Sequence, residues 1–153
     1  MESFAEWGYL GLFFASFLAA TIIPFLSSEA LLSLMIVNQY SLGLVLLVAT
    51  IGNWLGGLSC YYIGWIGKWD LIEKHLKIKA STLERLKPNV DRWGAPLAFF
   101  CWIPVIGDPL AVGLGFFKTN PISVALWILI GKGIRYLVWA YITFSGMNFY
   151  NNL

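Results

Sequence analysis

Charged residues are scarce in this chain of 153 residues: Asp, Glu, Lys and Arg make up 12% of it, whereas hydrophobic residues make up 59%. Soluble domains average about 25% charged residues, so this composition excludes an ordinary water-soluble globule. It also excludes a disordered chain, because disorder requires low hydrophobicity. The length suits a single domain. We therefore predict an all-α integral membrane protein.

Cysteine and histidine are also scarce, with two cysteines and one histidine in the chain. Cys60 and Cys101 lie inside apolar stretches, so we infer no disulfide framework and no metal site, and we expect no cofactor. A net charge of +2 is too small to indicate nucleic acid as a partner. His75 lies far along the chain from the carboxylates of the apolar stretches. This separation argues against a nucleophile activated by a base, so we do not expect an enzyme.

The few charges are concentrated in one connection, since seven Lys and Arg and four Asp and Glu lie between Lys68 and Arg92. Short loops rich in Lys and Arg stay in the cytoplasm, so we place residues 68–92 on that side. The connection, residues 67–93, divides a single membrane domain (1–153) into two apolar halves, residues 7–66 and 94–147. The acids before Trp7 are the reverse of a signal peptide's basic start.

The connection itself has an amphipathic pattern. Four of its apolar residues share one helical face, namely Leu71, Ile72, Leu76 and Ile78. This predicts a short helix at the membrane surface. Ser81-Thr82-Leu83-Glu84 is a capping-box pattern that opens a further turn or two. The alternative is a solvated loop containing two frayed helices.

Four apolar runs flank this connection: Trp7–Val37, Leu42–Ile66, Gly94–Phe117 and Pro121–Met147. Each is long enough to cross the hydrocarbon, which takes about 20 residues. The second run carries no charge, and we predict that it forms a transmembrane helix. Its small residues recur every four positions, at Gly52, Gly56, Cys60 and Gly64, with Asn53 beside them. Such a stripe favours close packing of another helix, and direct contact of these glycines with a substrate is the alternative.

The first and third runs are interrupted near their middles. Pro24 and Glu29 interrupt the first, and Pro104, Gly107, Asp108 and Pro109 interrupt the third. Proline breaks the helical hydrogen-bond ladder, and broken backbone at membrane depth requires protein or water around it. We therefore predict two re-entrant helical hairpins with an acid near each tip. Four simple helices, kinked at the prolines, are the alternative.

The two halves match in spacing. Glu29 precedes Gly52 by 23 residues, and Asp108 precedes Gly131 by the same 23. Each half then consists of a hairpin followed by a full crossing. Interrupted segments at corresponding positions are typical of transporters built from inverted repeats, so the spacing predicts that arrangement.

The fourth run contains two cations, Lys132 and Arg135, which are three residues apart and share a helix face. Together with Glu29 and Asp108 they form a formally neutral set within the membrane. One interpretation is a buried ion-pair network that docks the hairpins onto the helix. The other is a polar cavity that receives an anionic group or relays protons.

Ile51–Gly57 and Tyr62–Gly64 resemble the DedA family, also called the SNARE-associated or VTT-domain family. Trp102–Asp108, Gly131–Tyr136 and Glu29 after Pro24 are similar to its small YqaA-like branch. The resemblance implies opposed re-entrant loops in a bacterial inner membrane. It also implies transport of undecaprenyl phosphate or phospholipid, with proton coupling in some relatives.

The chain departs from the larger DedA proteins beside Pro104. Those proteins carry arginines three residues before and after this proline, where this chain has Cys101 and Gly107. We expect a flippase that moves an amphipathic anion, such as a lipid-linked phosphate or a phospholipid. In this chain Lys132 and Arg135 would supply the positive charge that binds the anion. The expected partners are membrane lipids, and a homodimer is one of the open oligomeric states. A structural or assembly protein, with the buried charges serving folding only, is the alternative function.

Overall fold

The computed structural model describes residues 2–20, 28–68, 70, 73–74, 78–103 and 105–152. Two predicted hairpin breaks, Pro24 and Pro104, lie outside these residues, and so does most of the predicted surface helix around His75. The described elements are all helical: α1 (Glu2–Ala19), α2 (Ser28–Val37), α3 (Leu42–Ile66), α5 (Ala80–Trp93), the 3-10 helix η1 (Ala95–Trp102), α6 (Gly107–Phe116) and α7 (Pro121–Asn151).

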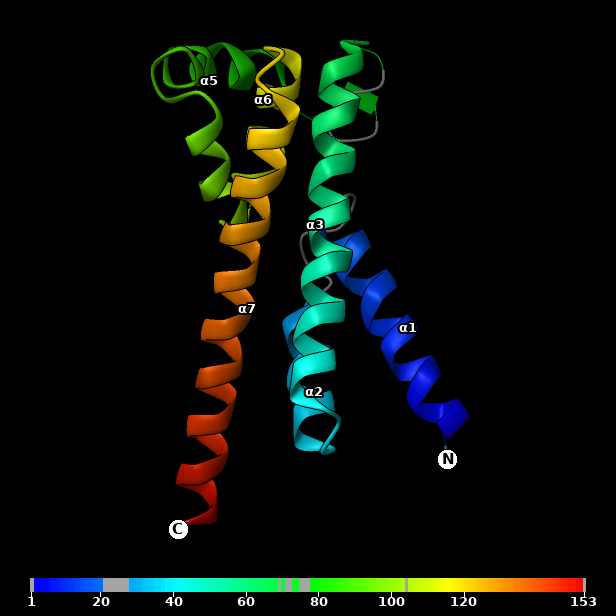
Figure 1. Cartoon of the computed structure of the whole chain (residues 1–153). Coiled ribbons are helices and arrows are strands. Elements are labelled where there is room, and N and C mark those ends of the chain that lie inside the picture. Colours follow the sequence, from blue (N-terminus) through cyan, green and yellow to red (C-terminus); the bar gives the residue numbers. More distant parts are fainter. Residues whose placement is uncertain are drawn as a thin grey trace.

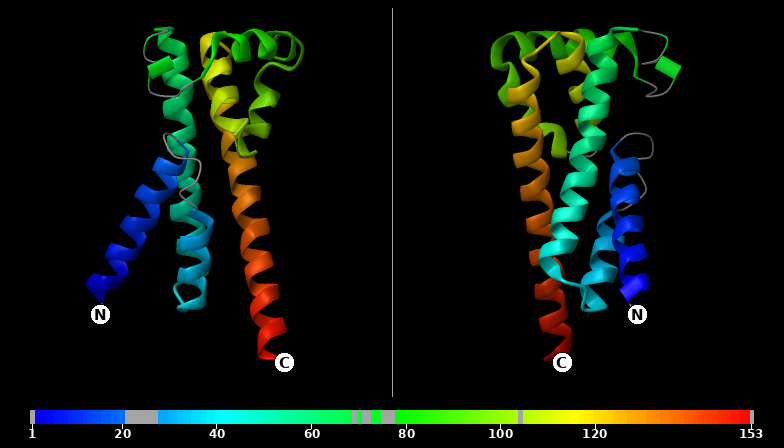
Figure 2. Two further views of the ribbon diagram at one scale, coloured as in Figure 1. Left: turned by 180° about the vertical axis from the view of Figure 1, so that it is seen from behind. Right: turned by 45° about the vertical axis from the view of Figure 1, so that its right-hand side comes forward.

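The chain runs between two ends of an elongated molecule. Both termini lie at one end, the terminal end, and α5 lies at the other, the α5 end (Figure 1). Helix α1 reaches mid-height from the terminal end, α2 returns, and α3 runs on to the α5 end. In the second half, η1 comes from the α5 end to mid-height, α6 returns, and α7 runs the full length back (Figures 1 and 2). The helices of the second half therefore follow the same path as those of the first half, but in the opposite direction.

Two helices are long and apolar enough to cross a membrane, over Leu42–Ile66 and Pro121–Tyr150. Only 33% and 28% of their most apolar windows are buried inside the molecule, whereas the core helix of a soluble protein is mostly buried. Large apolar side chains such as Ile122 and Leu137 are exposed on α7. The long helices thus offer lipid an apolar surface along much of their length.

The glycine stripe of α3 lies where other helices come closest. A Cβ atom on Gly52 would lie 2.6 Å from the carbonyl oxygen of Phe13 in α1, and one on Gly56 would lie 2.6 Å from that of Phe17. Further along, a Cβ on Gly64 would clash with the carbonyl of Val112 in α6. Because glycine has no side chain, α3 can pack closely on α1 along one half of its length and on α6 along the other.

The same contact occurs in both halves of the chain. Gly52 faces the carbonyl of Phe13, with Ser16 next to it, and Gly131 of α7 faces the carbonyl of Phe99, with Trp102 next to it. In each half, the residue that supplies the carbonyl lies three positions before the other residue that contacts the glycine. Gly52 and Gly131 are also the two glycines that the spacing pairs, so the long helix of each half holds its first helix in the same way.

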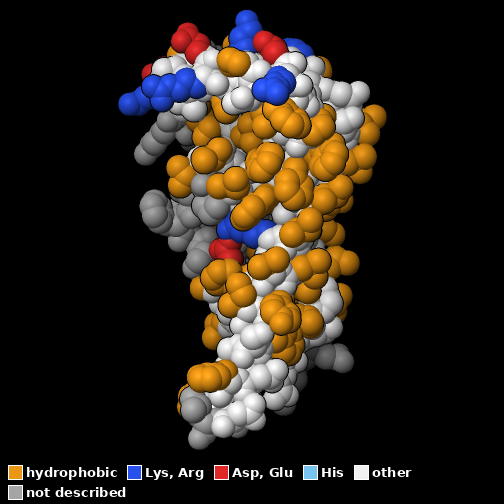
Figure 3. Space-filling view, turned by 90° about the vertical axis from the view of Figure 1, so that its left-hand side faces the viewer, with side chains coloured by type: hydrophobic (Ala, Val, Ile, Leu, Met, Phe, Trp, Pro, Cys, Tyr) orange, Lys and Arg blue, Asp and Glu red, His pale blue; other side chains and the backbone are white. Residues whose placement is uncertain are grey.

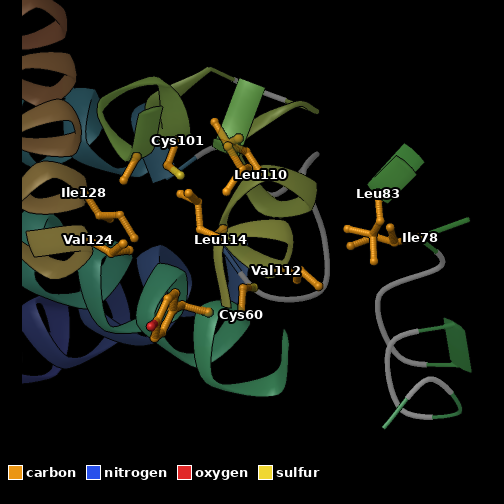
Figure 4. Packing of buried hydrophobic residues seen from close by; sticks show 13 residues of the cluster. Cys60, Ile78, Leu83, Cys101, Leu110, Val112, Leu114, Val124 and Ile128 are labelled. Atoms are coloured by element: carbon orange, nitrogen blue, oxygen red, sulfur yellow. The ribbon is translucent and has the colours of Figure 1, made fainter. Parts of the chain in front are cut away.

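A hydrophobic core fills the space between α3, α6, α7 and η1 (Figure 4). Its members include Cys60, Leu110, Leu114 and Ile128, all at most 2% exposed. Gly115 brings α6 so close to α3 that a Cβ there would clash with the carbonyl of Tyr61. The half of the molecule toward the α5 end is therefore packed backbone against backbone.

The capping-box prediction is wrong in both start and length. Helix α5 begins at Ala80 rather than after Ser81, Lys79 makes no side-chain capping bond, and the helix has 14 residues. Leu83 and Val90 are buried on one face of α5. This burial against the core supplies the stability that the local capping signal was expected to provide.

Lys118, in the turn between α6 and α7, lies at the α5 end. Its Nζ donates a hydrogen bond to the carbonyl of Trp65 near the end of α3 and lies 4.5 Å from the centre of the indole ring. Four straight crossings would put this turn at the opposite end from the charged connection. The contact therefore places this turn at the same end as α5.

A substitution at Gly64 tests the close helix crossing. Gly64→Ala should destabilise the protein by roughly 1–3 kcal/mol, because the methyl group meets backbone atoms that cannot turn away. Gly11→Ala is the matched control, since a Cβ there has no neighbour within 4 Å. Thermal unfolding in detergent, followed by size-exclusion chromatography, measures both. Equal stability of the two variants would contradict the packing described here.

Candidate functional site

The four charged residues predicted from the sequence line one cavity at mid-height, together with Asn53. Glu29 comes from the start of α2, Asp108 from the start of α6, and Lys132 and Arg135 from the middle of α7. The cavity measures about 40 Å³, which is room for a few water molecules. In this conformation the charges face one another across a small polar space.

Arg135 joins three segments at the cavity. Its Nη2 donates to Glu29 Oε1 of α2, and its Nη1 donates to the carbonyl of Trp102 at the end of η1, at 3.2 Å. The side chains of Arg135 and Glu29 are 25% and 14% exposed. The ion pair is therefore sheltered but still accessible from the side of the molecule.

Lys132 is more deeply buried, at 2% exposure. Its Nζ donates to the carbonyl of Asn53 at 2.7 Å, and Asn53 Nδ2 donates to the carbonyl of Ser16 in α1 at 3.1 Å. Gly57 makes room for this ammonium group, because a Cβ there would lie 3.0 Å from Nζ. Among the described residues its direct partner is thus a backbone carbonyl and not a carboxylate, and burying a cation in this way is costly.

The predicted ion-pair network contains one direct pair. Within the described residues, Glu29–Arg135 is the only salt bridge. Asp108 lines the same cavity as Lys132 but does not form a salt bridge with it. The sequence identified which charges share the cavity, whereas their pairing depends on where the short helices begin.

Two helix N-termini meet at the cavity. Helix α2 starts at Ser28 and α6 at Gly107, and both start at mid-height and run toward opposite ends (Figure 1). Their N-terminal N–H groups add positive partial charge to that of the two cations. Glu29 and Asp108, each the second residue of its helix, balance that charge. The cavity therefore combines two cations, two carboxylates and two helix N-termini.

Gly107 and Pro109 lie in the first turn of α6, so the interruption itself falls between Trp102 and Gly107. A Cβ on Gly107 would clash with the carbonyl of Cys101, so glycine lets η1 and α6 meet tightly. Pro109 needs no hydrogen-bond donor in a first turn. Among the described residues no group of His, Cys, Asp and Glu is arranged to hold a metal ion.

Ser28 and Tyr136 form a buried contact that the sequence analysis missed. Their hydroxyl oxygens are 2.9 Å apart, and both residues are at most 1% exposed. Each is the direct neighbour of a member of the ion pair, Glu29 or Arg135. The sequence does contain a signal for this contact, because a residue with a hydroxyl group adjoins each of the two charged residues within an apolar run.

The flank of the molecule exposes charge at mid-height. Figure 3 shows basic and acidic side chains there among hydrophobic ones, while the other charged atoms on this face lie at one end. A membrane around the hydrophobic surface would put this charged patch within its thickness. Charged side chains are therefore exposed on this flank between hydrophobic areas.

The ion pair can be tested by removing either partner. Arg135→Ala should lower stability by roughly 1–3 kcal/mol, because Glu29 then loses its charged partner in a sheltered site. Glu29→Gln should cost less than Glu29→Ala, since the amide oxygen still accepts a hydrogen bond. Yield and monodispersity in detergent measure these effects. An Arg135→Ala protein as stable as the parent would show that the pair contributes nothing to folding.

Comparisons with known proteins give close relatives by sequence. The inner membrane protein YqaA of Escherichia coli is 31% identical over 136 residues, 89% of this chain and 91% of that protein. Undecaprenyl phosphate transporter A of Staphylococcus aureus is 27% identical over 145 residues, 87% of this chain and 71% of that protein. An alkaline phosphatase-like protein of Lactococcus lactis is 27% identical over 147 residues, 88% of this chain and 66% of that protein.

No protein-family model matches the chain, and no solved structure is similar to it. The match to YqaA covers most of both chains, and two described helices can cross a membrane. This is therefore a multi-pass protein of the bacterial inner membrane, and the chain belongs to the DedA family, in its YqaA-like branch.

Proposed function

We propose that the protein moves an amphipathic anion, a lipid that carries a phosphate group, across the inner membrane. The observation that supports this most is the meeting of two cations and two helix N-termini at one mid-height cavity. A relative named undecaprenyl phosphate transporter A fits the same class of substrate. In this proposal, binding of the anion explains why charged residues are kept at membrane depth despite their free-energy cost.

The bonds in the cavity indicate how a phosphate would bind. Arg135 can form two parallel hydrogen bonds with phosphate, and Lys132 can act as a point charge beside it. In this structure Arg135 is held by Glu29 and Lys132 by the carbonyl of Asn53. A phosphate oxygen would replace these acceptors. The displaced carboxylate of Glu29 could then take up a proton, which would couple transport to protons.

The positions of the cations suit this branch of the family. The chain has Cys101 and Gly107 where the larger DedA proteins have arginines. Cys101 and Gly107 are in contact in the hairpin, since a Cβ on Gly107 would meet the Cys101 carbonyl. An arginine at residue 107 would have no room. The two cations of α7 reach the same cavity from the neighbouring helix.

In the proposed arrangement the interrupted helices are re-entrant hairpins of an inverted repeat. The equivalent contacts of Gly52 and Gly131 support the repeat. Lys118 near Trp65 supports the hairpins, because it shares an end with the basic connection. By the positive-inside rule the α5 end is cytoplasmic and both termini are periplasmic.

Thiol labelling tests this topology. A cysteine at Asn152 should react with a membrane-impermeant reagent added to intact spheroplasts, because the terminal end faces the periplasm. The matched control is Asn89→Cys, another exposed asparagine but on α5, which should react only after lysis. Protection of Asn152→Cys in intact cells would reject the arrangement.

A structural role is the second candidate, and one observation favours it. Both cations of α7 already have partners, in α2 and in α3. Such bonds can dock helices without any transport. Exchanging the pair, in Glu29→Arg with Arg135→Glu, separates the two roles. A swapped protein that folds and transports normally supports an architectural pair, whereas one that folds without transporting supports a binding site.

Lys132→Met tests the transport proposal directly. Methionine keeps the apolar volume of the lysine side chain, so the fold should persist while translocation of a lipid phosphate in reconstituted liposomes is lost. Lys118→Met is the matched control, because Lys118 also donates to a backbone carbonyl but lies at the α5 end. Undiminished translocation by Lys132→Met, with and without a pH gradient, would refute the proposed role of the cavity.

A further inference from the structure

Hydroxyl groups line the interface of α2 and α7 below the cavity. Besides the Ser28–Tyr136 contact, Ser33 Oγ lies 3.1 Å from Thr143 Oγ1, and Trp139 Nε1 donates to Ser33 Oγ at 3.0 Å. We call these five residues the hydroxyl seam. They lie between two helices that are otherwise rich in aliphatic residues, chiefly Leu and Ile.

The seam runs from the cavity toward the terminal end. Ser28 contacts a residue 108 positions later and Ser33 one 110 positions later, so α2 and α7 run side by side in the same direction. Thr143 follows Arg135 by eight residues, a rise of about 12 Å along a helix. Half of the hydrocarbon thickness is about 15 Å. The seam therefore extends from mid-depth almost to the membrane surface.

The corresponding interface on the other side of the cavity is closed. There α6 packs on α3 with Gly64 against the carbonyl of Val112 and Gly115 against that of Tyr61. Core residues such as Leu114 fill the rest at 0% exposure. The two short helices thus differ: α6 is sealed against its neighbour, and α2 meets α7 through polar groups.

Interhelical hydrogen bonds alone would explain a buried seam, since they hold transmembrane helices together. This seam is buried at Ser28 and Tyr136 but reaches the surface farther on, where Trp139 is 40% exposed and Ser33 and Thr143 are partly exposed. Polar groups that line a surface at membrane depth suit a hydrophilic path.

We propose that the hydroxyl seam is the route by which the anionic head group passes between the cavity and the terminal end, while its acyl chains stay in the lipid. This rests on the proposed function of the cavity. The hydroxyls and the indole N–H offer neutral donors in place of water, so a phosphate can move along them without being trapped by a charge. The head group meets full positive charge only at Arg135 and Lys132.

Cysteine accessibility tests the route without any transport assay. Ser33→Cys and Thr143→Cys, each in a Cys60→Ala, Cys101→Ala background, are reconstituted in liposomes and treated with a charged, impermeant thiol reagent. Both should react at least about tenfold faster than Ile142→Cys, because thiols form the reactive thiolate where water reaches them. Ile142 adjoins Thr143 but is 54% exposed on the apolar surface. Dioctanoyl phosphatidic acid should slow the reaction at both seam positions.

Equal reaction of all three cysteines would show that the seam is closed and only packs α2 on α7. Fast labelling that the phosphatidic acid does not slow would show a water path that head groups do not use. Either result overturns the proposal.

Hydroxyl-deletion variants separate this proposal from the function on which it rests. Thr143→Val should fold normally and slow translocation, whereas Thr50→Val, on α3 in an apolar groove, should not. If Lys132→Met abolishes translocation and Thr143→Val together with Ser33→Ala leaves it unchanged, the seam is refuted and the cavity stands. If none of these variants changes translocation, both are refuted.

Discussion

The ion pair between Arg135 and Glu29 ties the two halves of the chain together at the depth where helices start and stop. Arg135 also holds the carbonyl of Trp102 at the end of η1, so one guanidinium serves α2, η1 and α7. Unsatisfied backbone groups and isolated charges are both costly in hydrocarbon. Bringing helix ends and charges to one place lets each satisfy the other, and the remaining elements are arranged around that place.

Helix α3 is the scaffold that makes this meeting possible. Its glycines let α1 approach along one half of its length and α6 along the other, and Asn53 bonds both α1 and Lys132 between them. Lipid supplies no hydrophobic drive between helices, so close backbone contact must hold them instead. The position of the cavity halfway along α3 follows from this division.

The two halves share a course but differ in how firmly they are packed. The half toward the α5 end has a filled core and backbone contacts through Gly64 and Gly115. The half toward the termini joins α2 to α7 with hydroxyls and one sheltered ion pair. The proposed route of the head group follows this difference in packing, because it runs along the hydroxyls between α2 and α7.

Composition and spacing were sufficient for the helical membrane class, the two long crossings and the four charges of the cavity, because water and lipid sort residues by polarity alone. They did not determine the partners. One interpretation put Asp108 in an ion-pair network, yet it makes no salt bridge with any described residue. The contact of Ser28 with Tyr136 was not predicted, and α5 starts before its capping signal. Hydrogen bonds and direct salt bridges form only where the two atoms lie within a few ångströms of each other. Which groups come that close was decided by helix packing between residues more than 100 positions apart, a distance that local sequence patterns do not encode.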